Sequence, residues 1–282
     1  MKLKQNLYAL ALIFCSVSAT YFVTISTAQP GAPMVQATAD NEYQVGAVLY
    51  MQKAAEYRAL TYQAYNLAHW QLDADLDKKN LKKLPKEERR RPRAVVVDID
   101  ETVLDNSPAQ AYGIKTRSPF NIKDWLAWGE MRKAKAIPGA VEFLNYAVSM
   151  GVKVFFVSNR SEIQKQATID NLKNVGFNDV SLDNVILRTA EASKENRRTA
   201  ISARYRMVLL MGDNLDDLSN VFEKRTIAER FGEVDKIKTD WGKRWIVLPN
   251  AMYGTWENAI YEYGSLTEPQ KTEKRAAALE LP

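Results

Sequence analysis

AVVVDIDETVLDN, residues 94–106, is the stretch of this sequence that most directly predicts the fold. Four apolar residues, three of them β-branched, lead into a polar run that begins at Asp98 and includes Asp100. A short continuous apolar run is typical of a strand buried on both faces of a parallel sheet, and functional side chains gather at the carboxyl ends of such strands. The stretch therefore predicts a strand over residues 94–97 with functional carboxylates directly after it.

The chain after residue 94 alternates short apolar runs with amphipathic segments. Further strands are expected over residues 152–157, 184–187, 207–211 and 245–248, and helices over residues 140–150, 162–175, 194–204 and 215–222. Strands separated by helices pair in parallel through right-handed crossovers. The predicted fold class is therefore α/β, with a doubly wound, Rossmann-like parallel sheet as its core.

Other segments are predicted around this core. A helix is expected from residue 43 to about residue 76, because apolar residues recur at helical spacing there. The full set of predicted segments is a signal peptide at 1–28, a flexible leader at 29–42, the N-terminal helix and a basic connector at 43–93, the core at 94–264 with a small helical cap inserted at about 106–136, and a polar, frayed C-terminal tail at 265–282.

The first 28 residues have the character of a targeting segment. A basic start is followed by an apolar run, and small residues precede an expected cleavage after Ala28, with an earlier alternative after Ala19. A retained anchor is the alternative, since residues 7–28 are long enough to span a bilayer. The residue before Cys15 is not small, which disfavours lipid attachment. We expect a periplasmic or secreted protein, associated with the outer membrane if the segment is retained.

The residue composition excludes several kinds of protein. His69 is the single histidine, so a metal centre built from several histidines is excluded. Cys15 is the single cysteine and lies in the N-terminal apolar run, which excludes a cysteine phosphatase. The net charge of +5 comes from residues 78–93, which hold nine basic and two acidic residues. We interpret this run as a solvated connector, with attraction of anionic substrates or lipids as the alternative. The run has no interleaved aromatic residue, so no nucleic-acid partner is expected.

Polar side chains follow three of the expected strands and would meet at one edge of the sheet. They are Asp98 and Asp100 after the first strand, Ser158 and Asn159 after the second, and Asp213 and Asp217 after the fourth, with Lys194 opening the helix before the fourth. Carboxylates gathered in this way repel one another unless a cation lies among them. An all-oxygen ligand set favours Mg²⁺.

Four of these segments resemble, in order, the motifs of haloacid dehalogenase (HAD)-type phosphohydrolases. They are residues 94–106, VFFVSNR at 154–160, SKENRR at 193–198 and MGDNLDD at 211–217. Within that superfamily the chain most resembles the class C non-specific acid phosphatases, which are secreted or lipoprotein 5′-nucleotidases of bacteria with a four-aspartate signature. The resemblance also takes in residues 50–66, 137–147 and 248–257, and so extends from about residue 45 to residue 260.

The resemblance implies a role for each catalytic residue. Asp98 would be the nucleophile that forms an aspartyl-phosphate, and Asp100 would protonate the leaving oxygen and then deprotonate the attacking water. Ser158, Asn159 and Lys194 would hold the phosphoryl oxygens. The third motif lacks the aspartate that usually precedes its lysine, and Lys194 is the nearby basic residue that fits the place best.

The resemblance also implies the metal site. Mg²⁺ would be held by Asp98, by the backbone carbonyl of Asp100 and by Asp213, with Asp217 orienting a bound water molecule. Asp217 lies one helical turn beyond Asp213 and would face the same site, whereas the spacing turns Asp216 elsewhere.

Trp125 in the cap and Tyr253 would flank a nucleoside base, because aromatic faces stack on bases with little regard to their identity. The alternative for Trp125 is a place in the core of the cap. The predicted function is a secreted, Mg²⁺-dependent acid phosphatase for small phosphomonoesters, nucleoside 5′-monophosphates among them. The alternatives are a broad phosphomonoesterase or phosphotransferase without nucleotide preference, and a degenerate member that acts as a surface binding protein.

Overall fold

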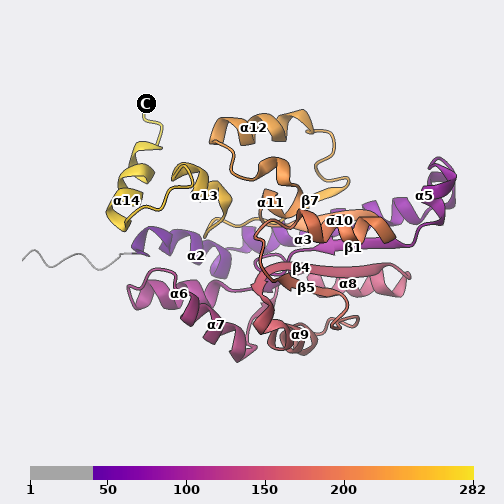
Figure 1. Ribbon diagram of the computed structural model, residues 1–282, viewed down its shortest axis with the longest axis horizontal. Helices are drawn as coiled ribbons and strands as arrows, with labels where there is room; N and C mark the ends of the chain where they lie inside the picture. The colour runs from indigo at the N-terminus through magenta and orange to yellow at the C-terminus, as the bar shows by residue number, and fades with distance from the viewer. Residues whose placement is uncertain (1–40) are drawn as a thin grey trace, which may run out of the picture. The chain divides into compact units, whose positions relative to one another are not determined.

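The computed structural model describes residues 41–282 (Figure 1). The predicted signal peptide and all but the last two residues of the predicted leader lie outside the described residues. Asn41 and Glu42, assigned above to the leader, belong to the first helical turn, where the Asn41 side chain donates a hydrogen bond to the carbonyl of Ser118. Within the described residues, no helix is both long and apolar enough to cross a membrane.

A five-stranded parallel sheet forms the centre of the fold, in the order β5–β4–β1–β6–β7. From β1 the chain moves outward through β4 to β5, and then crosses to β6 and β7 on the other side of β1. The order of strands thus reverses beside β1, which confirms the predicted doubly wound α/β sheet. The strands are β1 (Arg93–Val97), β4 (Lys153–Ser161), β5 (Val185–Arg188), β6 (Arg206–Gly212) and β7 (Trp245–Val247).

Helices cover both faces of this sheet (Figure 1). Those of the chain before β6 are η1 (Asn41–Gln44), α2 (Val45–Lys53), α3 (Ala55–Leu76), α4 (Lys78–Leu81), α5 (Lys86–Arg90), α6 (Ser107–Lys115), α7 (Ile122–Met131), α8 (Ala140–Ser149), η2 (Glu162–Gln164), α9 (Lys165–Asn174) and α10 (Glu195–Arg204). After β6 come α11 (Leu215–Leu218), η3 (Asn220–Phe222), α12 (Ile227–Lys236), α13 (Thr255–Ile260) and α14 (Glu268–Ala277). A two-stranded antiparallel ribbon of β2 (Leu104–Asp105) and β3 (Lys135–Ala136) flanks α6 and α7, which form the helical cap.

Alternate side chains of β1 belong to two separate cores. Val95 and Val97 pack in one core with residues of α3, α8 and α9, whereas Ala94 and Val96 pack in the other with residues of α10 and α11. All four are buried. Because the strand is covered on both faces, its sequence is continuously apolar, and this pattern made the strand readable from sequence.

The structure differs from the sequence prediction in three elements. The N-terminal helix is broken at Ala54, whose backbone is extended between α2 and α3. The helix expected over residues 215–222 is interrupted at Ser219, which is also extended and whose hydroxyl accepts from the Val221 amide. The C-terminal tail predicted to fray contains α14, stabilised by a capping box at Thr267 and by Arg275, whose guanidinium lies 3.7 Å from the ring centroid of Tyr43.

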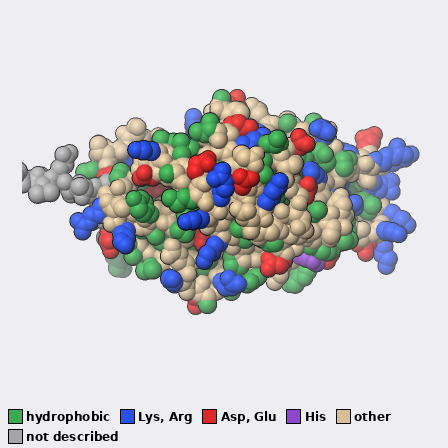
Figure 2. Space-filling view, turned by 90° about the horizontal axis from the view of Figure 1, so that it is seen from below, with side chains coloured by type: hydrophobic (Ala, Val, Ile, Leu, Met, Phe, Trp, Pro, Cys, Tyr) green, Lys and Arg blue, Asp and Glu red, His purple; other side chains and the backbone are tan. Residues whose placement is uncertain are grey.

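The basic connector forms α4 and α5, next to the amino end of β1. Figure 2 shows Lys and Arg side chains gathered at the end of the molecule where Figure 1 places α5. Most of these side chains are exposed, as expected of a solvated connector, whereas Arg93 forms an ion pair with Asp75. The connector lies at the opposite edge of the sheet from the carboxyl end of β1.

The N-terminal helix α3 supports the loop that follows β1. Tyr65 of α3 is buried, and its hydroxyl donates a 2.6 Å hydrogen bond to the carbonyl of Thr102. Its neighbour in the helix, His69, is stacked on Tyr146 at 4.0 Å and paired with Asp73, so it has a structural role. Gly139, which precedes α8, lies against Tyr65 and has a φ of +89°.

We expect Gly139→Ala to lower the free energy of unfolding by more than the roughly 1–2 kcal/mol that left-handed backbone costs a residue with a side chain. A Cβ at Gly139 would lie 3.0 Å from two Tyr65 carbons. Gly151→Ala is the matched control, because Gly151 also has a positive φ but has no heavy atom within 4 Å of such a Cβ. Denaturant unfolding measures both losses, and equal losses would contradict the expected crowding against Tyr65.

Candidate active site

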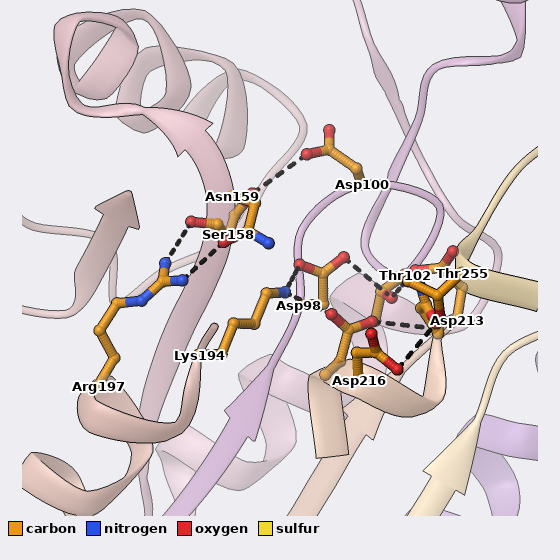
Figure 3. Close-up of polar contacts among 12 residues, drawn as sticks. Asp98, Asp100, Thr102, Ser158, Asn159, Lys194, Arg197, Asp213, Asp216 and Thr255 are labelled. Atoms are coloured by element: carbon orange, nitrogen blue, oxygen red, sulfur yellow. Dashed lines mark hydrogen bonds and ion pairs between the residues drawn. The ribbon is translucent and has the colours of Figure 1, made fainter. Parts of the chain in front are cut away.

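The carboxyl ends of β1, β4 and β6 bring the polar residues singled out from the sequence to one place (Figure 3). Asp98 directly follows β1, Ser158 and Asn159 lie within the last part of β4, and Asp213 directly follows β6. Lys194, directly before α10, points its ammonium group at the Asp98 carboxylate and pairs with it. The register of the sheet explains this convergence, because Val97 of β1 lies beside Met211 of β6.

Burial governs the electrostatics of this group. Burial raises the pKa of Asp98 well above its usual value, Lys194 opposes the rise, and the carboxylates of Asp217 and Asp213 add to it. Burial and the Asp217 carboxylate raise the pKa of Asp213 to about 7. Burial of Lys194 acts to lower its pKa, but its ion pairs with Asp217, at 2.7 Å, and Asp98 outweigh burial and raise that pKa. The cluster thus holds more negative charge than Lys194 alone can balance.

Three of the carboxylates could hold a cation. One oxygen from each of Asp98, Asp213 and Asp217 lies within 4.8 Å of the other two. Asp213 is held by hydrogen bonds from Thr102 at 3.2 Å and Asn250 at 2.8 Å. Three carboxylate oxygens gathered in a space with little solvent match the donor chemistry of a hard divalent cation, which would favour their ionised form. The residues present therefore fit the magnesium site expected from the sequence.

Asp216 takes no part in this cluster. Its carboxylate accepts hydrogen bonds from Arg230 at 2.9 Å and from Thr255 at 3.1 Å. The side chain thus faces α12 and α13, as the spacing along the sequence predicts.

Hydrogen bonds orient the side chains at the end of β4. The Ser158 hydroxyl donates to Oδ2 of Asp100 at 3.1 Å (Figure 3). Arg197 of α10 donates through Nη2 to the Asn159 side-chain carbonyl at 2.6 Å and through Nη1 to the Ser158 backbone carbonyl at 2.7 Å. Oδ1 of Asp100 accepts from Arg160 Nε at 2.9 Å. Both Ser158 and Asn159 therefore have fixed positions at the edge of the sheet.

Further residues contact this site and were not singled out from the sequence, among them Thr102, Asn106, Arg160, Arg197 and Asn250. Asn250 follows β7, and it could have been found from the sequence because functional side chains gather after the strands of a parallel sheet. Arg160 follows Ser158 and Asn159 directly and carries the same signal. Thr102 and Arg197 have no comparable signal, because their partners are set by how the loops fold.

A cavity of about 1050 Å³ opens over the carboxylates and extends beneath the cap. Asp98 and Asp100 line its floor, and Trp125 of α7 and Tyr253 line its wall. Trp125 and Tyr253 are both half-buried. The C-terminal helix α14 contributes Lys271 to the same wall, so the segment predicted to be a frayed tail helps to enclose the cavity.

The two tryptophans of α7 have different surroundings. Trp128 packs against the main core, and its Nε1 donates a 2.8 Å hydrogen bond to the Asn106 side chain. Trp125 lies 6.3 Å from the exposed ring of Phe120, centroid to centroid, and 5.7 Å from the Arg160 guanidinium. Both tryptophans line the cavity, but only Trp128 also packs against the main core, so the alternative of a core aromatic describes Trp128 better than Trp125.

Solved structures resemble this fold. The class C acid phosphatase from Bacillus anthracis is 36% identical, covers 86% of this chain and 98% of its own, and superimposes with a TM-score of 0.79. A crystal structure of the class C acid phosphatase from Bacillus anthracis with tungstate bound gives a TM-score of 0.78 at the same identity and coverage.

Curated relatives match shorter stretches. Acid phosphatase 1 of Solanum lycopersicum is 32% identical over 134 residues, which are 44% of this chain and 51% of that protein. The stem 31 kDa glycoprotein of Glycine max is 27% identical over 169 residues, 56% of this chain and 58% of that protein. The chain thus spans about half the length of these relatives.

A family model matches almost the whole predicted core and the helix before it. The model describes the HAD superfamily, subfamily IIIB, acid phosphatase, and it matches residues 16–256. This match, together with the class C phosphatase structure, confirms the resemblance inferred from the four motifs. The chain belongs to subfamily IIIB of the HAD superfamily, the acid phosphatases.

Proposed function

We propose that this chain is a secreted acid phosphatase that hydrolyses small phosphomonoesters through an aspartyl-phosphate, with Mg²⁺ as its cofactor and nucleoside 5′-monophosphates among its substrates. The observation that carries the proposal is the Asp98 carboxylate, which is enclosed on three sides by Lys194, Asp213 and Asp217 yet lines the floor of the cavity. A carboxylate in that place is accessible to a small ester and shielded from bulk water.

The first step forms a covalent bond between the enzyme and phosphorus. An oxygen of Asp98 attacks the phosphorus atom, and the bond from phosphorus to the ester oxygen breaks. Asp100, which also lines the cavity floor, donates its carboxyl proton to the departing oxygen and releases an alcohol. The products of this step are the alcohol, aspartyl-phosphate at Asp98 and ionised Asp100.

The second step reverses these roles. Asp100 removes a proton from a water molecule as that water attacks phosphorus, and the bond from phosphorus to Asp98 breaks. Inorganic phosphate leaves, Asp98 is an ionised carboxylate again, and Asp100 again carries its proton.

Charge on the phosphoryl oxygens is balanced by groups that the sheet holds in advance. The Ser158 hydroxyl, the Asn159 amide and the Lys194 ammonium are donors of the kind that stabilise charge developing on phosphoryl oxygens. Asp98, Asp213 and Asp217, with the backbone carbonyl of Asp100, would hold Mg²⁺. When bound, the cation offsets the repulsion among these carboxylates and draws negative charge from the phosphoryl group. The class C acid phosphatase from Bacillus anthracis was solved with tungstate bound. Tungstate is a tetrahedral oxyanion like phosphate, so this relative supports a phosphoryl-binding site in the present chain.

The proposed preference for nucleotides depends on the aromatic wall of the cavity. Trp125 and Tyr253 line the same cavity as Asp98. A flat base stacked on these rings would leave the 5′-phosphate free to reach the carboxylates. A phosphomonoesterase or phosphotransferase without nucleotide preference would use the same floor without this wall.

We expect Asp98→Asn to reduce turnover by several orders of magnitude with the fold intact, because the variant keeps the size of the side chain and loses the attacking charge. Release of inorganic phosphate measures turnover, and circular dichroism checks the fold. Substantial activity in a folded Asp98→Asn protein would contradict an aspartyl-phosphate mechanism. A folded wild-type protein that releases no phosphate would instead favour the surface binding protein.

We expect Mg²⁺ to raise the midpoint of thermal unfolding of EDTA-treated protein, because an ion that binds the native state stabilises it by mass action. The same addition should restore the activity that EDTA removes. Asp213→Asn should lose the shift in midpoint, and Asp216→Asn, which changes a neighbouring carboxylate bound to Arg230, should keep it. Full activity in excess EDTA would rule out the metal site.

We expect Trp125→Ala and Tyr253→Ala each to lower kcat/KM for nucleoside monophosphates roughly tenfold or more, since stacking contributes about 1–3 kcal/mol per base. Glycerol phosphate should be little affected, because its phosphoryl group meets other residues. Trp256→Ala is the matched control, since that half-exposed tryptophan does not line the cavity. Equal losses on all esters would place both rings in the cap core, and no loss would favour the phosphatase without nucleotide preference.

A further inference from the structure

The two oxygens of the Asp100 carboxylate have different partners. Oδ1 accepts two hydrogen bonds, from Arg160 Nε at 2.9 Å and Asn106 Nδ2 at 2.8 Å, and it also lies 2.9 Å from Arg160 Nη2 in the ion pair. Oδ2 accepts from the Ser158 hydroxyl at 3.1 Å, and this is its one hydrogen bond among the described residues. One oxygen is thus saturated by nitrogen donors, and the other is directed toward the phosphoryl-binding side chain of Ser158.

Arg160 is built into the protein interior. Its side chain is 2% exposed, and the guanidinium also donates to the Asn106 carbonyl oxygen at 3.1 Å and to the Thr168 hydroxyl at 3.4 Å. Asp100 is its one ion-pair partner within the described part of the chain. A buried guanidinium with fixed partners cannot move away from the carboxylate without leaving unpaired charge behind.

The second anchor of Oδ1 is tied to the cap. Asn106 is fully buried, and its side-chain oxygen accepts from both Arg160 and Trp128 of α7, while its Nδ2 donates to Asp100. Its backbone amide donates to the buried Glu101 at 2.6 Å. The position of Oδ1 is therefore determined by β4 on one side and by the base of the cap on the other.

We propose that Arg160 is a positioning residue that selects Oδ2 of Asp100 as the oxygen that transfers the proton, an inference that rests on the proposed function. A carboxyl oxygen whose two lone pairs both accept N–H groups, and which also faces a buried guanidinium, has no room for a proton of its own. The proton of the acid form therefore sits on Oδ2. In the first step the Oδ2–H bond breaks and the leaving oxygen gains that hydrogen, and in the second step Oδ2 takes a proton from water.

The effect of Arg160 on the rate of hydrolysis should depend on the leaving group of the ester. An alkoxide leaves phosphorus with difficulty unless it is protonated, whereas p-nitrophenolate leaves readily without a proton. Loss of the orientation of Asp100 should therefore slow hydrolysis of glycerol phosphate much more than hydrolysis of p-nitrophenyl phosphate. The value of kcat/KM is the proper measure, because it covers the steps up to release of the alcohol.

The test compares Arg160→Met, which keeps an unbranched apolar stem and loses all N–H donors, with the wild type on these two esters. We expect the ratio of kcat/KM for glycerol phosphate to that for p-nitrophenyl phosphate to fall about ten- to a hundredfold, the scale of a misplaced catalytic group. Asp100→Asn should lower the same ratio, and Arg160→Met in the Asp100→Asn background should lower it no further. Arg160→Lys, which keeps the charge and some donors, should restore part of the ratio.

Thr168→Val is the matched control. It removes the contact of Arg160 at 3.4 Å and leaves both hydrogen bonds to Oδ1 in place, so it should lower thermal stability without changing the ratio. The Arg160 guanidinium also lies 5.7 Å from Trp125, where a nitrophenyl ring could stack. Weaker stacking would lower kcat/KM for the aryl ester and so move the ratio in the opposite direction.

Equal losses on both esters in Arg160→Met, or a ratio that Thr168→Val lowers as much, would overturn the positioning role. A further fall of the ratio in the double variant would also overturn it. The proposed function is tested separately, by whether the wild-type protein releases phosphate from both esters. If Arg160→Met does not fold, the positioning role is tested on Arg160→Lys instead. An unchanged ratio in Arg160→Lys, together with a lowered unfolding midpoint, would assign Arg160 to stability alone.

Discussion

The repulsion among Asp98, Asp213 and Asp217 is the constraint on which the site depends. Parallel pairing of β1 with β6 sets two of these side chains at adjacent strand ends, where burial makes their charges costly. Lys194 offsets part of that cost by pairing with Asp98 and Asp217. We propose that a bound cation offsets the rest, which would leave the Asp98 carboxylate at the cavity floor available for reaction.

A surrounding layer of neutral and cationic donors keeps these carboxylates in place. Thr102 and Asn250 hold Asp213, while Arg197 holds the end of β4. Each donor comes from a segment distant in sequence from its acceptor, so the site is as rigid as the packing of the loops around the sheet. The carboxylates thus provide the negative charge of the site, and the residues that donate hydrogen bonds to them fix the orientation of their side chains.

The cavity wall is made of segments from both ends of the described chain. The cap supplies Trp125, the loop after β7 supplies Tyr253, and η1 and α14 close the remainder, with Arg275 of α14 packed on Tyr43 of η1. In the proposed function, the sheet edge carries the phosphoryl chemistry, whereas elements outside the sheet select among esters. We therefore expect that changes in these outer segments can alter the choice of substrate without disturbing the carboxylates.

The five strands, the place of the cap and the carboxylates after β1 and β6 were predictable from sequence, because each is signalled by residues that are neighbours in the chain. The break at Ala54, the helix α14 and the pairing of Arg160 with Asp100 were not. Sixty positions separate Arg160 from Asp100 in the chain. Contacts between distant residues decide which oxygen of Asp100 faces Arg160 and which tryptophan of α7 packs against the main core. Only the folded chain makes those contacts, so only the tertiary structure decided them.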